Sequence, residues 1–279
     1  MERWGPERLD ELARLVDRAL PQERLTADEL LASSWDDPGI VLGTPSGDGA
    51  VSAVVRSFGE LRIGWVKLIV VAPERQREGV GKALLHTAET WAFDQGASEV
   101  QLGGAAPFYL WPGVDVEMLG MLCLAESSGY ESVGSEINMA LPTEFRAEPP
   151  AGVALRRVLD DRDIEAVQTF VSAHWPWWRP ELDRGVEQGG CHAAFTVSAH
   201  DVVGFACHSV NRSGWIGPMG TDPQRRHAGV GHALLGALCA DLMVAHITRA
   251  EISWVGPVRF YAKAGARVSR SFRSYRKRR

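Results

Sequence analysis

The feature that most limits the fold of this chain is a short segment that occurs twice. Its first copy, PERQREGVGKALL, starts at Pro73, and its second copy, PQRRHAGVGHALL, starts at Pro223, which is 150 positions later. In both copies a Gly-x-Gly turn leads into a stretch whose apolar residues fall on one face of a helix. Such a repeat predicts two structural units of the same kind, each built around this turn.

The elements around the two copies also follow the same order. Each half of the sequence begins with a short strand and two helices, and continues with strands that lead into the repeated turn. Between the halves, residues 143–152 contain Pro149-Pro150, which interrupts regular structure and is typical of a linker. We therefore expect one domain over residues 1–148 and a second over 149–279. The order predicts an α+β fold, with a mixed, mostly antiparallel sheet flanked by helices in each domain.

Composition argues against several classes of function. A chain of 279 residues with 45% hydrophobic residues fits soluble domains, and no apolar run is long enough to span a membrane. The net charge of −5 gives no support for nucleic-acid binding, although six basic residues crowd positions 270–279. The four cysteines form no C-x-x-C pair, which favours a cytoplasmic location over a disulfide framework. We expect no metal and no nucleic-acid or membrane partner.

The repeated turn has the chemistry of an anion site. Gly79, Gly81, Gly229 and Gly231 have no Cβ, so the backbone can approach a ligand closely. The N–H groups that follow lie at the N-terminus of a helix, where they have no partner within the helix and where its dipole is positive. Each turn therefore predicts a phosphate-binding site.

Three phosphate motifs compete at these turns. The dinucleotide motif G-x-G-x-x-G does not match, because Leu84 and Leu234 replace its third glycine. The Walker motif does not match, because Gln76 replaces its first glycine and Ala83 has no hydroxyl for Mg²⁺. The pattern [RQ]-x-x-G-x-G/A after a strand matches in both copies, from Gln76 to Gly81 and from Arg226 to Gly231.

With both of these matches, nearly the whole chain resembles a tandem pair of domains from the GNAT superfamily of acetyl-CoA-dependent N-acyltransferases. The resemblance implies that acetyl-CoA is the acyl donor and that each loop binds the pyrophosphate of coenzyme A. It also implies that backbone groups of the preceding strand bind the pantetheine arm. The implied cofactor-binding residues are Ile69, Val71, Gln76, Arg77, Gly79, Val80, Gly81 and Lys82 in the first domain, and Met219, Thr221, Arg226, Gly229, Val230, Gly231 and His232 in the second.

The resemblance also implies a tyrosine as general acid, early in the helix after the fifth strand. Tyr261, in the segment FYAKAGA, has this position in the second domain, although a packed core residue is the alternative interpretation. In the first domain one alignment places Tyr109 at this position and another places Ala125 there. We favour Ala125, because Pro112 follows Tyr109 closely and argues against a helix start.

An aromatic segment lies near the expected acceptor side of the second domain. His174, Trp175, Trp177 and Trp178 surround a proline, and the resemblance implies that this region lines the acceptor pocket. We expect these rings to form a wall for an aromatic or cationic amine, with packing between the two domains as the alternative. Glu251 and His174 are both candidates for the general base, and the sequence does not decide between them.

These expectations combine into one predicted function and one alternative. The predicted function is an acetyl-CoA-dependent N-acetyltransferase, in which a small-molecule or peptide amine attacks the donor directly and Tyr261 acts as general acid. The alternative is a catalytically silent acyl-CoA-binding sensor or structural module. The amine and the oligomeric state do not follow from the sequence, because acceptor pockets are formed by variable loops.

Overall fold

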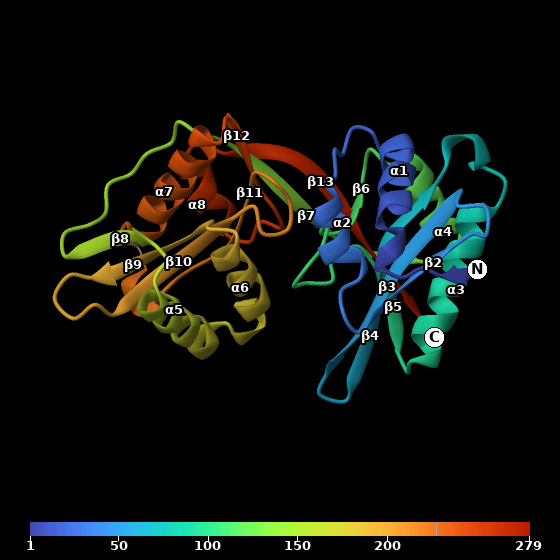
Figure 1. The fold of residues 1–279 in the computed structure, drawn as a ribbon, viewed down its shortest axis with the longest axis horizontal. Coiled ribbons are helices and arrows are strands. Elements are labelled where there is room, and N and C mark those ends of the chain that lie inside the picture. The colour runs from blue at the N-terminus through green and yellow to red at the C-terminus, as the bar shows by residue number, and fades with distance from the viewer. Residues whose placement is uncertain (227) are drawn as a thin grey trace. The chain divides into compact units, whose positions relative to one another are not determined.

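The computed structural model describes residues 1–226 and 228–279, and it divides into two compact units (Figure 1). Unit 1 contains residues 1–136 together with 271–279, and unit 2 contains residues 137–270. Both units are mixed sheets with helices on their faces, so the predicted α+β class is confirmed. Among the described residues, no helix has the length and apolar character needed to cross a membrane.

Unit 1 has one sheet, in the order β1-β2-β3-β4-β5-β13. Neighbouring strands are antiparallel except for β4 and β5, which are parallel. Its strands are β1 (Glu2–Arg3), β2 (Gly39–Gly43), β3 (Gly49–Phe58), β4 (Leu61–Val71), β5 (Glu99–Leu102), β6 (Val114–Asp115) and the end of β13 (Arg267–Arg278), and its helices are α1 (Leu9–Ala19), α2 (Ala27–Ser34), α3 (Val80–Asp94) and α4 (Leu119–Ser127).

Helices cover both faces of the unit 1 sheet. Leu84 and Leu85 of α3 pack on one face in a cluster that includes Val66 of β4. Leu12 of α1 packs on the other face in a separate cluster that includes Leu68 of β4. Val66 and Leu68 reach opposite faces because an extra residue lies between them, and from Leu68 to Val71 the side chains alternate between the two clusters.

Unit 2 repeats this arrangement with the order β8-β9-β10-β11-β12-β7, in which β11 and β12 are parallel. The side chain of Asp160 caps α5 by accepting from the Asp163 N–H at 2.9 Å. The strands are β7 (Glu131–Pro142), β8 (Val153–Arg157), β9 (Cys191–Thr196), β10 (Val202–His208), β11 (Trp215–Thr221) and β12 (Arg249–Ile252), and the helices are α5 (Asp161–His174), α6 (Arg179–Glu187), α7 (Val230–Val244) and α8 (Val258–Lys263).

The two halves of the sequence exchange their last strands. In unit 2, residues 139–142 of β7 pair with β12, although β7 begins in unit 1. In unit 1, residues 275–278 of β13 pair with β5, although β13 begins in unit 2. The units consequently divide at 136/137 and 270/271, which differs from the boundary expected at 148. Pro149-Pro150 marks an irregular connection, but these long-range strand pairs decide where the compact units end.

Basic residues at the C-terminus have acidic partners within unit 1. Lys277 donates to Glu89 of α3 at 2.8 Å, and Arg276 lies 3.7 Å from Glu99 of β5. Phe272 is completely buried with residues of α1 and α2. The final strand is thus held by both charge and burial.

We predict that Phe272→Ala lowers the free energy of unfolding by about 3–5 kcal/mol, because it leaves a cavity in the core of unit 1. Denaturant unfolding of the full chain measures this change. Val268→Ala, at a 55% exposed position of the same strand, is the matched control and should change stability by less than about 0.5 kcal/mol. Equal effects of the two substitutions would contradict a structural role for the returning strand.

Candidate functional site

Both repeated turns begin a helix at a glycine with a positive φ angle. Gly79 is the N-cap of α3 at φ +87°, and Gly229 is the N-cap of α7 at φ +91°. Residues with a Cβ rarely adopt this conformation, which explains the glycine in both copies. The Ala83 N–H donates to the Gly79 carbonyl at 3.0 Å, so the N–H groups before Ala83 lie at the open end of the helix. His227 of the second turn lies outside the described residues.

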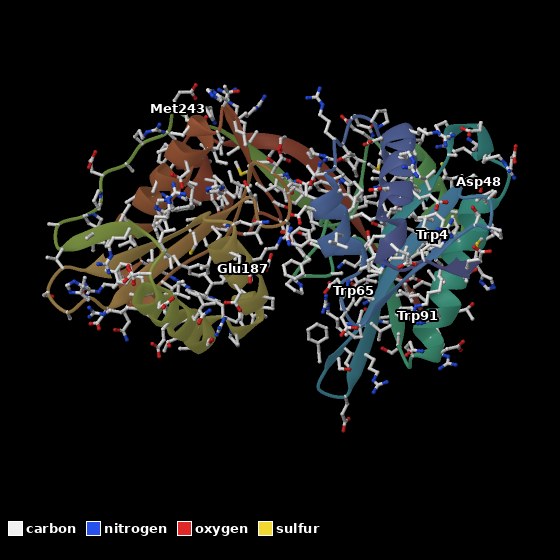
Figure 2. The ribbon with its side chains drawn as sticks, viewed as in Figure 1. Trp4, Asp48, Trp65, Trp91, Glu187 and Met243 are labelled. Atoms are coloured by element: carbon white, nitrogen blue, oxygen red, sulfur yellow. The ribbon has the colours of Figure 1, made fainter. Side chains whose placement is uncertain are left out.

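Ionic and hydrogen-bonding contacts hold the first turn against its own sheet. Arg75 donates to Asp48, which is labelled in Figure 2, at 2.8 Å. The Gln76 amide donates to the Val71 carbonyl at 3.1 Å. The Thr44 hydroxyl donates to Asp48 at 2.6 Å, and this bond lowers the pKa of the Asp48 carboxyl. The turn is therefore preorganised before any ligand binds.

In each unit the strand before the turn separates from its parallel neighbour. The β4–β5 pairing ends at Val66 and Leu102, after which the Gly103 N–H donates to the Val66 carbonyl at 3.0 Å. Residues 68–71 of β4 remain paired with β3 on the other side. In unit 2, the β11–β12 pairing ends at Ile216 and Ile252. One edge of the strand is left for an extended ligand, which can hydrogen-bond to it as an added strand.

A β-bulge coincides with this separation. In β4 the register shifts so that Lys67 is an extra residue between Val66 and Leu68. In β11 the corresponding shift falls between Ile216 and Met219, where Gly217 has the position equivalent to Lys67. Bulges re-aim side chains and end regular pairing, so both units have the same backbone device with different side chains at it.

Unit 1 contains a cavity of about 880 Å³ along this open edge. It extends from residues 66–71 of β4 to the turn and the first residues of α3, and it is also bordered by α1, α4 and the segment after β5. The lining includes seven of the eight cofactor residues expected in this unit, which are Ile69, Val71, Gln76, Arg77, Gly79, Gly81 and Lys82. Val80 is not part of this lining.

Sequence reasoning missed several residues of the cavity, including Lys67, Trp111, Cys123 and Leu124. Trp111 is 8% exposed, and its indole N–H donates to the carboxylate of buried Glu23 at 3.1 Å. No motif marks these positions, since Trp111 belongs to an irregular segment and Cys123 to a short helix. The one signal in the sequence was Lys67 itself, because a single charged residue inside an apolar strand requires a partner when the strand is buried.

Tryptophan side chains fill the corresponding region of unit 2. The Trp175 N–H donates to the Val171 carbonyl just as the Leu20 N–H donates to Val16 in unit 1, so Trp175 occupies the position of Leu20. The Trp178 N–H donates to the Trp175 carbonyl as the Glu23 N–H donates to the Leu20 carbonyl, so Trp178 occupies the position of Glu23. The sequence of unit 2 thus replaces a leucine and a carboxylate by two large rings.

These rings pack on the sheet of unit 2 itself. Trp175 lies 5.4 Å from Trp178 and 6.1 Å from Phe205 of β10, between ring centroids. A Cβ built on Gly220 of β11 would lie only 2.5 Å from the Trp175 ring. His174 is exposed beside Trp175, and Trp177 is 63% exposed. Of the four residues expected to line an acceptor pocket, the structure brings three together and leaves Trp177 outside the cluster.

The second turn is also covered by an aromatic side chain. Phe260 of α8 stacks on His232 with ring centroids 4.4 Å apart, and a Cβ built on Gly231 would lie 3.1 Å from the Phe260 ring. In unit 1, a Cβ built on Gly81 would lie 3.6 Å from the Leu124 side chain. The remaining expected residues of this site are placed as follows: Arg226 and Gly229 are exposed, Met219 and Thr221 are half-buried, and Val230 is buried.

Tyr261 is buried in the apolar core of unit 2, and this burial raises its pKa. Its carbonyl accepts from the N–H groups of Ala264 and Ala266, and the carbonyl of Ala125 accepts from Ser128 and Tyr130 in the same pattern. Ala125 therefore has the position in α4 that Tyr261 has in α8. Tyr109 lies in an irregular segment before β6.

Glu251, one of the two candidates for the general base, lies on β12 and accepts from the Asn138 amide at 2.9 Å. His174, the other candidate, lies at the end of α5. Within the described part of the chain, no group of three or more His, Cys, Asp or Glu side chains is arranged to hold a metal ion.

Comparison with known proteins agrees with this geometry. Residues 9–109 match the model of the acetyltransferase (GNAT) family. A tandem GNAT protein from the clavulanic acid biosynthesis pathway superposes with a TM-score of 0.74 at 14% identity, over 99% of this chain and 97% of that one. Residues 9–109 are therefore similar to this family, and the whole chain has a fold like that of a tandem GNAT protein. A search of curated protein sequences found no match.

Two other solved structures match over 99% of this chain. A GCN5-related N-acetyltransferase from Sphaerobacter thermophilus has a TM-score of 0.69 at 20% identity, over 99% of this chain and 94% of that one. A GCN5-related glucosamine N-acetyltransferase region of a fungal multi-domain GH3 β-N-acetylglucosaminidase has a TM-score of 0.78 at 17% identity. This match covers 99% of the present chain but only 38% of the fungal one. At these identities the likeness concerns the fold.

We predict that Gly220→Ala destabilises the protein by about 1–3 kcal/mol, because the new methyl group overlaps the Trp175 ring. Thermal and denaturant unfolding measure the change. Gly256→Ala is the matched control, because a Cβ there meets no atom within 4 Å. A neutral Gly220→Ala would show that Trp175 does not pack tightly on β11.

Proposed function

We propose that this protein is an acetyl-CoA-dependent N-acetyltransferase and that unit 1 binds the donor and carries out the transfer. The observation that carries the proposal is the cavity of about 880 Å³ in unit 1, which follows the open edge of β4 to the glycine turn. Unit 2 has the same backbone features, but Trp175, Trp178 and Phe260 pack against its strand and turn. A family match over residues 9–109 supports the same choice of unit.

The residues of the cavity suit the three parts of the donor. The pyrophosphate would bind the N–H groups at the start of α3, beside the cationic side chains of Arg77 and Lys82. The pantetheine arm would lie along the backbone from Ile69 to Val71, where β4 has lost its parallel neighbour. The thioester would then lie near Val66 and Lys67, where the two strands separate.

Acetyl transfer at this position requires two proton movements. The neutral amine of the acceptor attacks the thioester carbonyl, the carbon–sulfur bond breaks, and the coenzyme A thiolate takes up a proton. Backbone N–H groups at the separated strands are suited to stabilise the negative charge that develops on the carbonyl oxygen. The acceptor must enter on the side of α1, where Leu20, Trp111 and Met118 give the cavity an apolar wall.

The acceptor is proposed to be an amine of a small molecule or peptide. Support for the amine class comes from the GNAT family match and from the neighbour described as a glucosamine N-acetyltransferase region. The expected acceptor role of His174, Trp175, Trp177 and Trp178 belongs to unit 2 and stays a prediction. The cytoplasmic location also stays a prediction, with support from four free cysteines.

We predict that Gly81→Glu lowers the affinity for coenzyme A at least tenfold, measured by calorimetry. A carboxylate at a helix N-terminus is tolerated by the fold but repels a pyrophosphate. Gly81→Ala is the matched control, because a Cβ there is 3.6 Å from Leu124 and carries no charge. Gly231→Glu tests unit 2 in the same way. Loss of binding in Gly231→Glu with full binding in Gly81→Glu would assign the donor site to unit 2.

The role of Tyr261 as general acid is a competing prediction for a reaction in unit 2. If Tyr261 supplies the proton, Tyr261→Phe lowers kcat with little change in coenzyme A affinity. Transfer in unit 1 predicts that kcat is unchanged in Tyr261→Phe and that kcat/KM for acetyl-CoA falls at least tenfold in Gly81→Glu. Release of free thiol from acetyl-CoA with a set of amines gives kcat and kcat/KM for both variants. Binding of coenzyme A without turnover for any amine would favour the sensor alternative.

A further inference from the structure

Lys67 is an unusual residue for this chain. The sequence has four lysines and 26 arginines, and arginine is generally preferred for a buried ion pair. The Lys67 side chain is nevertheless 2% exposed, and its Nζ donates to Asp36 at 2.6 Å. Arg56 forms an ion pair with the same carboxylate oxygen. Two cations therefore share one buried anion, and the pair is not electrically balanced.

This environment makes the Lys67 amine available in its neutral form. Burial lowers the pKa of Lys67 to about 8, because an apolar environment disfavours the ammonium. The charge of Arg56 acts in the same direction, whereas Asp36 opposes it. At pH 7 about a tenth of such a group carries the free electron pair that a nucleophile needs. An arginine in this position has no such neutral form.

Lys67 also has a defined position along the cavity of unit 1. It is the extra residue of the β4 bulge, and it follows Val66, at which the pairing with β5 ends. Lys82 lines the same cavity at the turn. If the donor binds as proposed, its pyrophosphate lies beside Lys82 and its thioester lies near Lys67. The equivalent residue of unit 2, Gly217, has no side chain to react.

We propose that Lys67 is a modification site, at which Nζ accepts the acetyl group of acetyl-CoA bound in unit 1. This inference rests on the proposed function, because it requires the donor in that cavity. The Lys67 ammonium first loses one proton to water, and the neutral amine then attacks the thioester carbonyl. A nitrogen–carbon bond forms as the carbon–sulfur bond breaks, and the second proton passes from nitrogen to the thiolate. The products are acetylated Lys67 and free coenzyme A.

Acetylation changes both charge and shape at the end of the cavity. The product is a neutral amide, so Asp36 loses Lys67 as a cationic partner and keeps Arg56. The added acetyl group occupies space where the thioester of a second donor would lie. The modified protein therefore binds acetyl-CoA more weakly than the unmodified protein, and the reaction limits itself.

The full chain incubated with isotopically labelled acetyl-CoA, then denatured and digested with trypsin, tests this proposal. Unmodified Lys67 gives the peptides IGWVK and LIVVAPER, whereas acetylated Lys67 blocks cleavage and gives IGWVKLIVVAPER. We expect Lys67 to react at least about tenfold faster than exposed Lys82, because the thioester would lie near Lys67 whereas Lys82 lies at the turn, beside the pyrophosphate. The rate should saturate with acetyl-CoA, rise with pH through about 8, and fall when coenzyme A competes.

Three variants separate a site-directed reaction from adventitious acetylation. Lys67→Arg keeps the cation beside Asp36 and should remove the fast phase of labelling. Asp36→Asn removes the charge that stabilises the ammonium and should increase labelling of Lys67 at pH 7 severalfold, with its folding checked by thermal unfolding. Gly81→Glu should abolish labelling of Lys67 together with coenzyme A binding.

The outcomes distinguish this inference from the proposed function. Labelling of Lys67 that is no faster than that of Lys82, in protein that binds coenzyme A by calorimetry, would overturn the inference alone. Labelling that does not saturate, or that persists in Gly81→Glu, would also overturn it. Absence of coenzyme A binding in the unmodified protein would overturn both.

Discussion

The separation of β4 from β5 beyond Val66 is the constraint on which the candidate site depends. A parallel strand that keeps both neighbours has no free backbone groups, so a ligand can only lie above it. Here residues 68–71 keep their pairing with β3 and lose it toward β5, which leaves one edge open within the body of unit 1. The bulge at Lys67, the cavity and the glycine turn all lie along that edge.

The two units show that one backbone arrangement can be open or filled. Both have parallel central strands that separate, a one-residue bulge, and a helix that begins at a glycine with positive φ. In unit 1 the positions over the open strand hold Leu20 and Glu23, and a cavity remains. In unit 2 they hold Trp175 and Trp178, and the rings pack onto Gly220. The units differ mainly in the volume of the side chains over the strand, and less in the backbone of the turn.

Exchange of the last strands links the stability of each unit to the other half of the sequence. β13 supplies a sheet neighbour for β5 and buries Phe272 beneath α1 and α2. Its pairing with β6 places it beside Val114, which lines the cavity of unit 1. The residues that line the cavity come from the first half of the chain, and the C-terminal strand holds one of them, Val114, through this pairing. Arg273, Arg276 and Lys277 of this strand have acidic partners on α4, on β5 and on α3.

The sequence by itself determined the local features of this protein. Gly79 and Gly229 require a conformation that depends only on the absence of a Cβ, and Asp160 caps its helix through a contact three residues away, so both were predictable. The repeat at an offset of 150 indicated two like units, and the motif at the turns indicated the ligand class. Tertiary structure decided what lies far apart in the sequence: the exchange of β7 and β13, the contact of Trp111 with Glu23, and the burial of Lys67 beside Asp36. Such contacts depend on which strands pair and which side chains fill the space between layers, and neither leaves a periodic signal along the chain.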